Sequence, residues 1–243
     1  MKLNIAICYK GLLRTIDRTF DNHKKFLFGD NNIDIFCHTW DTNNDVTYNF
    51  VKNLPECKFI FKEEFKNFNN HPYDSIFFDG KINDNLHSQN LKFVESHNIV
   101  LHSKPFNILS HLYSTQQSYI LCDLYSQINN KKYDLVCVLR PDILFYNSIN
   151  FYELIYEKIN ISWFEKTDDL LNCKNAIIDH IAISKPEVIK TYCETFLNVS
   201  GLYFKQKKPL IPEVLFGSHL NQSNIEINML STIHTVFKPE GTI

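Results

Sequence analysis

Several residues and motifs that mark familiar protein classes are scarce or missing in this chain. Glycine occurs only 6 times in 243 residues, and the sequence contains neither a GxGxxG nor a GxxxxGK[ST] motif. Their absence argues against a dinucleotide-binding fingerprint and against a P-loop. An HExxH zinc motif and a GxSxG nucleophile elbow are missing too. The formal charge of -2 and the pI of about 6.5 argue against a nucleic-acid-binding protein that works through a basic face.

Paired cysteines and long hydrophobic segments are missing as well. The seven cysteines include no CxxC pair, and Cys8, Cys37 and Cys137 lie within apolar runs. This is typical of buried thiols in a reducing compartment. The apolar run near the N-terminus is too short for a signal peptide or a membrane span, and no later segment reaches spanning length. We therefore expect a cytoplasmic protein with no transmembrane segment and no disulfide framework.

What the sequence does contain is an alternation of strand-like and helix-like stretches. The hydrophobic fraction of 44% suffices for a sizeable core in one domain that spans residues 1–243. Strands are predicted for the apolar runs at residues 3–8, 33–40, 57–62, 133–139 and 159–164. Amphipathic stretches predict helices at residues 15–28 and 110–129. A short helix is expected near residues 151–158, and other helices begin at Pro186 and near Pro212.

This alternation predicts an α/β fold with a mainly parallel, Rossmann-like central sheet flanked by helices. Residues 3–8, 33–40 and 133–139 should be neighbouring parallel strands, because continuously apolar strands need cover on both faces. The stretch from residue 66 to residue 90 is polar, long and without helical periodicity. It predicts a surface excursion that is more mobile than the sheet.

An Arg-Pro-Asp sequence interrupts the most apolar run of the chain, "VCVLRPDILF" at residues 136–145. The chain has only three arginines against 22 lysines, so Arg140 is notable. Pro141 ends the strand, because it lacks an amide proton and keeps the preceding residue out of the helical region. Arg140 and Asp142 suit a metal-bound diphosphate, because arginine grips phosphate bidentately and Mg²⁺ or Mn²⁺ often takes one or two carboxylates. A purely structural ion pair remains the alternative.

Other polar residues fall where predicted strands end, and ligands of open α/β sheets bind at the carboxyl ends of strands. The first strand leads into Gly11 and Arg14, and the second into His38 and Asp41. Each has an ordinary structural interpretation: a turn glycine, a surface charge, a buried histidine with hydrogen-bond partners, and a helix cap. The same holds for Asp179, Glu213 and His219, which could be a strand-end charge, a first-turn helix acid and a surface histidine.

Six blocks of the sequence resemble, in the same order, bacterial and large-virus glycosyltransferases of capsular-polysaccharide and lipopolysaccharide synthesis, including the WavE-like proteins. The resemblance runs from Ile5 to about Leu220. The blocks are "IAICYKGLLRT", "DIFCHTWD", "YSTQQSYILCDLY", "KYDLVCVLRPDILF", "IIDHIAIS" and "PEVLFGSHL".

The resemblance implies a GT-A type fold, with a nucleotide-sugar-binding half at residues 1–145 and an acceptor-side half at residues 146–243. Asp142 matches the second acid of the Asp-x-Asp motif that holds Mn²⁺ or Mg²⁺ in such enzymes, whereas Arg140 replaces the first. The remaining implied roles are a diphosphate-binding loop at Gly11 and Arg14, a nucleoside pocket edge at His38 and Asp41, a general base at Asp179, and a late acid or metal-binding histidine at Glu213 and His219.

The leading hypothesis is a metal-assisted glycosyltransferase that moves a sugar from a nucleotide-sugar donor to the hydroxyl group of a glycan acceptor. Arg14, Arg140 and a metal on Asp142 would neutralise the leaving diphosphate. Asp179 is the first candidate for the base and Glu213 the second. Two alternatives remain open: a catalytically silent nucleotide-sugar or glycan-binding protein on the same fold, and another enzyme of phosphorylated substrates such as a nucleotidyltransferase. The second of these usually needs a cluster of metal-binding carboxylates, which the sequence lacks.

Overall fold

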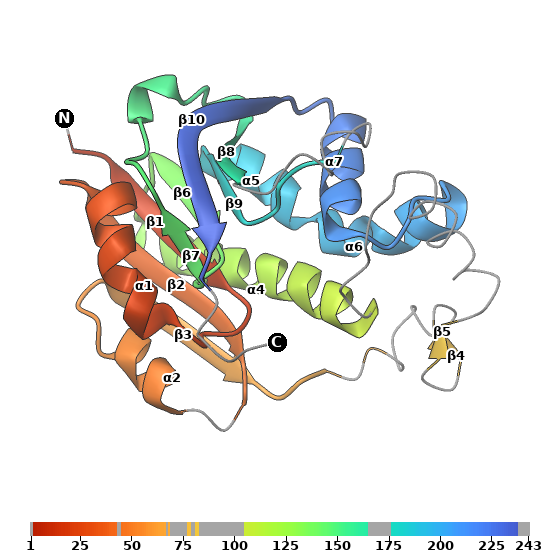
Figure 1. Ribbon diagram of the computed structural model, residues 1–243, viewed down its shortest axis with the longest axis horizontal. Coiled ribbons are helices and arrows are strands. Elements are labelled where there is room, and N and C mark those ends of the chain that lie inside the picture. The colour runs from red at the N-terminus through yellow and green to blue at the C-terminus, as the bar shows by residue number, and fades with distance from the viewer. Residues whose placement is uncertain are drawn as a thin grey trace.

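The central element of the fold is one mixed sheet of eight strands, shown with its helices in Figure 1. The computed structural model describes residues 2–42, 45–66, 68, 77–78, 81–82, 105–164 and 176–237. The order across the sheet is β3-β2-β1-β6-β9-β8-β10-β7, and the sheet curls strongly into a half-barrel. The strands are β1 (Asn4–Lys10), β2 (Asn32–Trp40), β3 (Cys57–Glu63), β6 (Leu135–Leu139), β7 (Ile143–Phe145), β8 (Ile159–Phe164), β9 (Ile181–Ser184) and β10 (Ile227–Val236).

The helices cover both faces of this sheet. A separate two-stranded ribbon pairs β4 (Phe77–Phe78) with β5 (Lys81–Ile82). Shorter helical turns occupy Lys24–Phe28, Phe151–Glu153 and Gly201–Lys205. The α-helices are α1 (Ile16–His23), α2 (Asp45–Lys52), α4 (Pro105–Asn129), α5 (Pro186–Cys193), α6 (Thr195–Ser200) and α7 (Pro212–Gln222).

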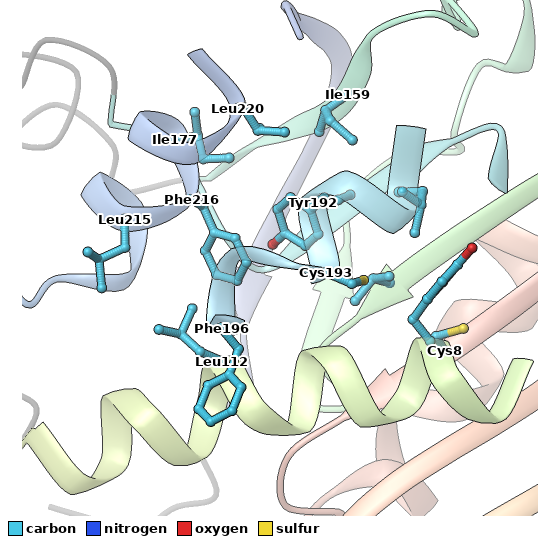
Figure 2. Close-up of a cluster of buried hydrophobic side chains, with 14 of the residues drawn as sticks. Cys8, Leu112, Ile159, Ile177, Tyr192, Cys193, Phe196, Leu215, Phe216 and Leu220 are labelled. Carbon is cyan, nitrogen blue, oxygen red and sulfur yellow. The ribbon is translucent and has the colours of Figure 1, made fainter. Parts of the chain in front are cut away.

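The prediction of three neighbouring parallel strands is confirmed. β1 lies between β2 and β6 and runs parallel to both. Its side chains alternate between two cores, because successive residues of a strand point to opposite faces. Ala6 and Cys8 face the core beneath α4 and α5, whereas Ile5, Ile7 and Tyr9 face the core on the α1 side. Figure 2 shows the first of these cores, where side chains from the strands meet those of α4, α5 and α7.

The prediction of a mainly parallel sheet is only partly right, because the sheet is mixed. β9 runs antiparallel to both β6 and β8, β10 runs parallel to β8, and β7 runs antiparallel to β10. All four residues of β9 are buried. The apolar pattern of a fully buried strand is the same in either direction, so it carries no information about orientation. The α/β class stands, and the GT-A order remains a proposal.

The boundaries of the predicted elements agree with the structure in most of the described chain. The predicted third strand is β3, the helix at residues 110–129 is the longer α4, and helices begin at Pro186 and Pro212. A short helix expected near residues 151–158 is a single turn at Phe151–Glu153. The polar stretch of residues 66–90 lies almost wholly outside the described residues, so its predicted mobility stays a prediction.

The sheet topology brings the candidate residues to one edge. β1, β2, β6, β8 and β10 end at this edge, whereas the antiparallel β7 and β9 begin there. Residues that follow β6 and residues that precede β9 are therefore neighbours, although about 40 positions separate them in the sequence. The division of the chain at residue 145 stays a prediction.

Candidate functional site

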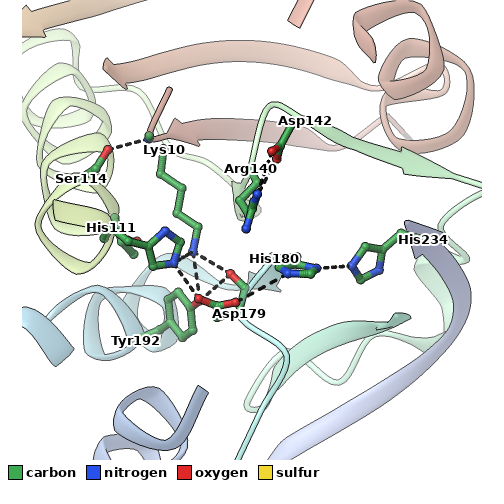
Figure 3. A network of polar contacts seen from close by, with 11 residues as sticks. Lys10, His111, Ser114, Arg140, Asp142, Asp179, His180, Tyr192 and His234 are labelled. Atoms are coloured by element: carbon green, nitrogen blue, oxygen red, sulfur yellow. Dashed lines mark hydrogen bonds and ion pairs between the residues drawn. The ribbon is translucent and has the colours of Figure 1, made fainter. Parts of the chain in front are cut away.

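A buried lysine lies at the centre of the polar cluster on this edge (Figure 3). Lys10 is the last residue of β1 and is only 1% exposed. Its Nζ donates a hydrogen bond of 2.7 Å to the main-chain oxygen of Asp179 and lies 5.6 and 5.2 Å from the ring centres of Tyr192 and Phe216. Burial lowers the pKa of Lys10 to about 8, and the Asp179 carboxylate opposes that shift. Near physiological pH the Lys10 amine is therefore present in both its protonated and its neutral form.

Asp179 joins this lysine to a histidine of α4. Its Oδ2 lies 2.7 Å from Nε2 of His111, and its Oδ1 lies 4.0 Å from Nε2 of His180. Burial alone would raise the pKa of the Asp179 carboxyl, but His111, Lys10 and His180 together hold it well below its usual range. Asp179 is therefore an ionised, buried carboxylate at neutral pH.

The second candidate acid, Glu213, is in the opposite protonation state. It lies in the first turn of α7, and its main-chain oxygen accepts a hydrogen bond of 3.1 Å from the amide of Ile177, two residues before Asp179. Burial and the negative charge of Asp179 raise the pKa of Glu213 to about 8. The structure thus brings together the two acids proposed as bases, one charged and one protonated. Two neighbouring carboxyl groups whose pKa values are shifted in opposite directions are typical of acid–base sites.

The Glu213 pKa predicts a pH-dependent effect on stability. A carboxyl whose pKa is raised in the folded state favours unfolding once the pH exceeds the unfolded pKa of about 4.3, and this penalty is complete above pH 8. Glu213→Gln removes the ionisable group, so it should increase the free energy of unfolding by roughly 3–5 kcal/mol at pH 8.5, because one pKa unit corresponds to about 1.4 kcal/mol, and by nothing at pH 4. Urea denaturation at both pH values measures the difference.

The matched control is Glu187→Gln, which changes an exposed first-turn acid of α5. The free energy of unfolding of Glu187→Gln, relative to wild type, should not increase as the pH rises. An equal gain for the two variants, or a loss of stability in Glu213→Gln at pH 8.5, would contradict a protonated Glu213.

Arg140 and Asp142 form the ion pair that the sequence suggested as one interpretation. The guanidinium group donates two hydrogen bonds, of 2.9 Å from Nε and 2.7 Å from the terminal nitrogen, to the two carboxylate oxygens. The side chains are 30% and 18% exposed, so the pair borders solvent. Burial would raise the pKa of Asp142, but Arg140, with His180 and Arg14, keeps it lowered. Both groups are charged at neutral pH.

A chain of histidines extends the cluster along the sheet edge. Nδ1 of His180 lies 2.9 Å from Nε2 of His234, and Nδ1 of His234 lies 2.7 Å from Oγ of Ser162. The main-chain oxygen of His180 accepts a hydrogen bond of 3.0 Å from the amide of Arg140. Burial lowers the pKa of both histidines, so they are neutral at pH 7.

The predicted nucleotide loop lies beside a separate surface pocket. Gly11 has a φ of 88°, a conformation that favours glycine, and its amide donates a hydrogen bond of 2.6 Å to Ser114 of α4. Arg14 is exposed and lines an open pocket, whose empty volume of about 260 Å³ includes open solvent. The lining residues are Leu13, Arg14, Thr39, Trp40, Thr42, Thr47, Tyr48 and Lys62.

His38 and Asp41 contribute to this region in different ways. His38 is fully buried, with Nδ1 2.8 Å from Oγ of Ser114 and Nε2 2.7 Å from Oε1 of Glu63. A ligand cannot contact it directly, so the interpretation as a buried, hydrogen-bonded histidine fits the structure better than a place at the pocket edge. Asp41 is partly exposed, and its Oδ1 lies 3.5 Å from Nζ of Lys62 at the pocket.

The expected metal ligands do not meet. His219 is buried on α7, and its Nε2 has no hydrogen-bond partner in the described chain. Asp142 lies in the turn between β6 and β7, which Figure 1 shows apart from α7. Both oxygens of Asp142 face Arg140, and the described residues contain no group of three or more potential metal ligands. The residues present therefore do not fit a preformed metal centre.

Sequence reasoning missed Lys10, His111, His180 and His234. Lys10 carries one local signal, because a lysine in the otherwise apolar run "NIAICYK" has to be buried with a partner. His111 carries none, since its partner Asp179 is 68 positions away and belongs to another element.

The comparisons with known proteins add no assignment. No model of a known protein family matches the chain, and no curated protein matches it significantly. Among the described helices, none is both long and apolar enough to cross a membrane. The geometry of the cluster is therefore the basis for a functional conclusion.

Proposed function

We propose that this protein transfers a sugar from a nucleotide-diphosphate sugar to a hydroxyl group of a glycan acceptor. One observation carries the proposal: cations and carboxylates of opposite protonation state gather at the edge of the sheet where the parallel strands end. In open α/β sheets this edge is the usual place of a nucleotide ligand. The expected GT-A type fold is part of the same proposal.

The cations suit the charge that develops on the leaving group. When the bond between the sugar and the diphosphate breaks, negative charge grows on a phosphate oxygen. Arg140, 30% exposed and fixed by Asp142, can bind this oxygen, because a guanidinium group pairs bidentately with phosphate. Arg14 borders both Asp142 and the open pocket, so it can reach the second phosphate.

The pocket beside Arg14 suits the nucleoside part of the donor. Its lining includes the partly exposed ring of Tyr48 beside Lys62, and a ring of this kind can stack on a base. A donor that spans from this pocket to Arg140 would bring its anomeric carbon towards Asp179 and Glu213. These acids belong to the segment before β9 and to the start of α7.

Use of Mn²⁺ or Mg²⁺ stays a prediction. A metal ion would have to take Asp142 away from Arg140, or share it, because both carboxylate oxygens are already engaged. No step of the proposed transfer depends on that exchange. The engaged Asp142 is also the observation that favours the silent binding protein as the second candidate, since neither of its carboxylate oxygens is free for a metal.

Donor binding is the first test. A ligand at a hundred times its Kd adds about 2.7 kcal/mol to the free energy of unfolding. We expect at least one member of a panel of nucleotide-diphosphate sugars to raise the melting temperature, and Arg140→Gln to abolish the increase. The screen is run with and without Mn²⁺. A panel that gives no increase under either condition would contradict both the transferase and the silent binding protein.

A further inference from the structure

His111 is the histidine of the cluster with the shorter contact to Asp179 and the more exposed side chain, because His180 lies 4.0 Å from that carboxylate and its side chain is 12% exposed. The side chain of His111 is 18% exposed, whereas Asp179 is 6% exposed and Lys10 is 1% exposed. Figure 3 shows His111 on α4, beside the Lys10 amine and Asp179, with the Arg140–Asp142 pair across the cluster. The imidazole is therefore the most exposed of these three side chains.

The contacts of His111 determine which ring nitrogen carries its proton. Nε2 lies 2.7 Å from Oδ2 of Asp179, a carboxylate that can only accept a hydrogen bond, and its contact with Nζ of Lys10 is longer, at 3.4 Å. Burial, together with the positive charges of Lys10 and Arg140, lowers the pKa of His111, so the ring is neutral at pH 7. The single proton then resides on Nε2 and is donated to Asp179. Nδ1 keeps its lone pair as an acceptor.

The two acids suit the role of base less well. Asp179 has its Oδ2 engaged by His111, is almost fully buried, and has a pKa well below its usual range. A carboxylate of this kind takes protons poorly. Glu213 already holds a proton at neutral pH. A neutral imidazole whose opposite nitrogen is bound to a buried carboxylate is a stronger base, because that carboxylate stabilises the imidazolium that forms.

We propose that His111 is the general base of the transfer and that Asp179 is the residue that positions it. This inference rests on the proposed function. In a single displacement, Nδ1 of His111 removes the proton of the acceptor hydroxyl while the hydroxyl oxygen bonds to the anomeric carbon. The bond from that carbon to the diphosphate oxygen breaks, and its electron pair leaves with the diphosphate. The imidazolium of His111 is held by Asp179 until the proton passes to water.

Variants of His111 test the role by turnover. His111→Ala should lower kcat about 100-fold or more, the range of general-base catalysis, with an unchanged Kd for the donor. Added imidazole should restore part of this activity in His111→Ala but not in the bulkier His111→Gln. Tyr119→Phe, which removes a hydroxyl group from the same helix outside the cluster, is the control and should keep wild-type kcat. Wild-type turnover in His111→Gln would overturn the proposal.

The pH dependence of kcat/KM distinguishes a positioning role of Asp179 from a purely structural one. The charged groups that act on His111 are Lys10 of β1, Arg140 after β6 and Asp179 before β9, and of these Asp179 raises its pKa. His180, Tyr192 of α5 and Glu213 of α7 interact with Asp179. Asp179→Asn should therefore move the acidic limb of kcat/KM to lower pH, besides lowering kcat. An unmoved limb in a folded Asp179→Asn variant would contradict the positioning role.

A measurement that does not depend on turnover tests the role of His111 separately from the proposed sugar transfer. Nitrogen-15 NMR of the histidine side chains at pH 7.5 should find Nε2 of His111 protonated and Nδ1 unprotonated. A proton on Nδ1, or an imidazolium, would overturn the assignment of His111 even if sugar transfer is observed. Failure of every donor to turn over counts against the proposed function, while the NMR result still decides the state of His111.

Discussion

Replacing Asp179 with asparagine should lower the free energy of unfolding by about 3 kcal/mol at pH 7, the size expected when one partner of a buried charge pair is lost. The carboxylate lies among Lys10, His111 and Arg140, and its removal leaves the buried Lys10 and the partly exposed Arg140 with less compensation for their positive charge. Because the folded pKa of Asp179 is depressed, its contribution is complete above the unfolded pKa of about 3.9 and is lost as the pH falls below that value. Urea denaturation of the wild type and of Asp179→Asn measures this change in the free energy of unfolding.

The pH dependence distinguishes this charge effect from a packing defect. The difference between wild type and Asp179→Asn should be constant from pH 7 to about 5 and should shrink at pH 3. Asp134→Asn is the control, because Asp134 is exposed and accepts one hydrogen bond from the amide of Asn4 at the opposite edge of the sheet. It should cost about 1 kcal/mol or less. A difference for Asp179→Asn that is the same at pH 3 and pH 7 would contradict the account.

Replacing Arg140 with glutamine should lower kcat/KM for sugar transfer by about 10²–10³-fold, the usual effect of removing one donor to a developing negative charge. Arg140 is the cation that both borders solvent and is fixed by a bidentate partner. Steady-state kinetics with the donor found in the binding screen measures the loss. Arg18→Gln, which neutralises an exposed arginine on α1, is the control and should keep wild-type kinetics. Equal kinetics for the two variants would exclude Arg140 from the site.

Asp142→Asn separates positioning of Arg140 from metal binding. The amide keeps the shape of the carboxylate but loses the charge that holds Arg140, so turnover should fall by at least tenfold while the fold remains intact. If Asp142 acts through Arg140, the concentration of Mn²⁺ or Mg²⁺ that gives half-maximal turnover is the same as in wild type. An increase in that concentration would assign Asp142 to the metal, as the resemblance to GT-A enzymes implies.

The central strands were predictable because a continuous apolar run in the local sequence already indicates a buried strand. The runs that became β1, β2 and β6 are continuously apolar, which predicts strands covered on both faces, and the three strands lie side by side between two cores. The direction of β9 was not predictable from its four buried residues. That direction matters, because it places Asp179 beside the end of β6.

The site was predictable where polar residues interrupt or end apolar runs. Arg140 and Asp142 were found in this way, and both lie in the cluster. His111 could not be found so, because its environment comes from residues of β1, α7 and the segment before β9. Long-range contacts of this kind leave no periodicity in the sequence of α4. His38 shows the opposite error, since an interior histidine can resemble a ligand-binding residue when only its position at the end of a strand is known.

Release of nucleoside diphosphate from nucleotide-sugars is the most direct test of the central claim. The purified chain is incubated with each donor of the panel in the presence of Mn²⁺, with and without mixed glycan acceptors, and free nucleoside diphosphate is measured over time. The account predicts release from at least one donor, faster with acceptor, and its loss in Arg140→Gln. Binding of a donor without any release would contradict transfer and leave the silent binding protein as the function.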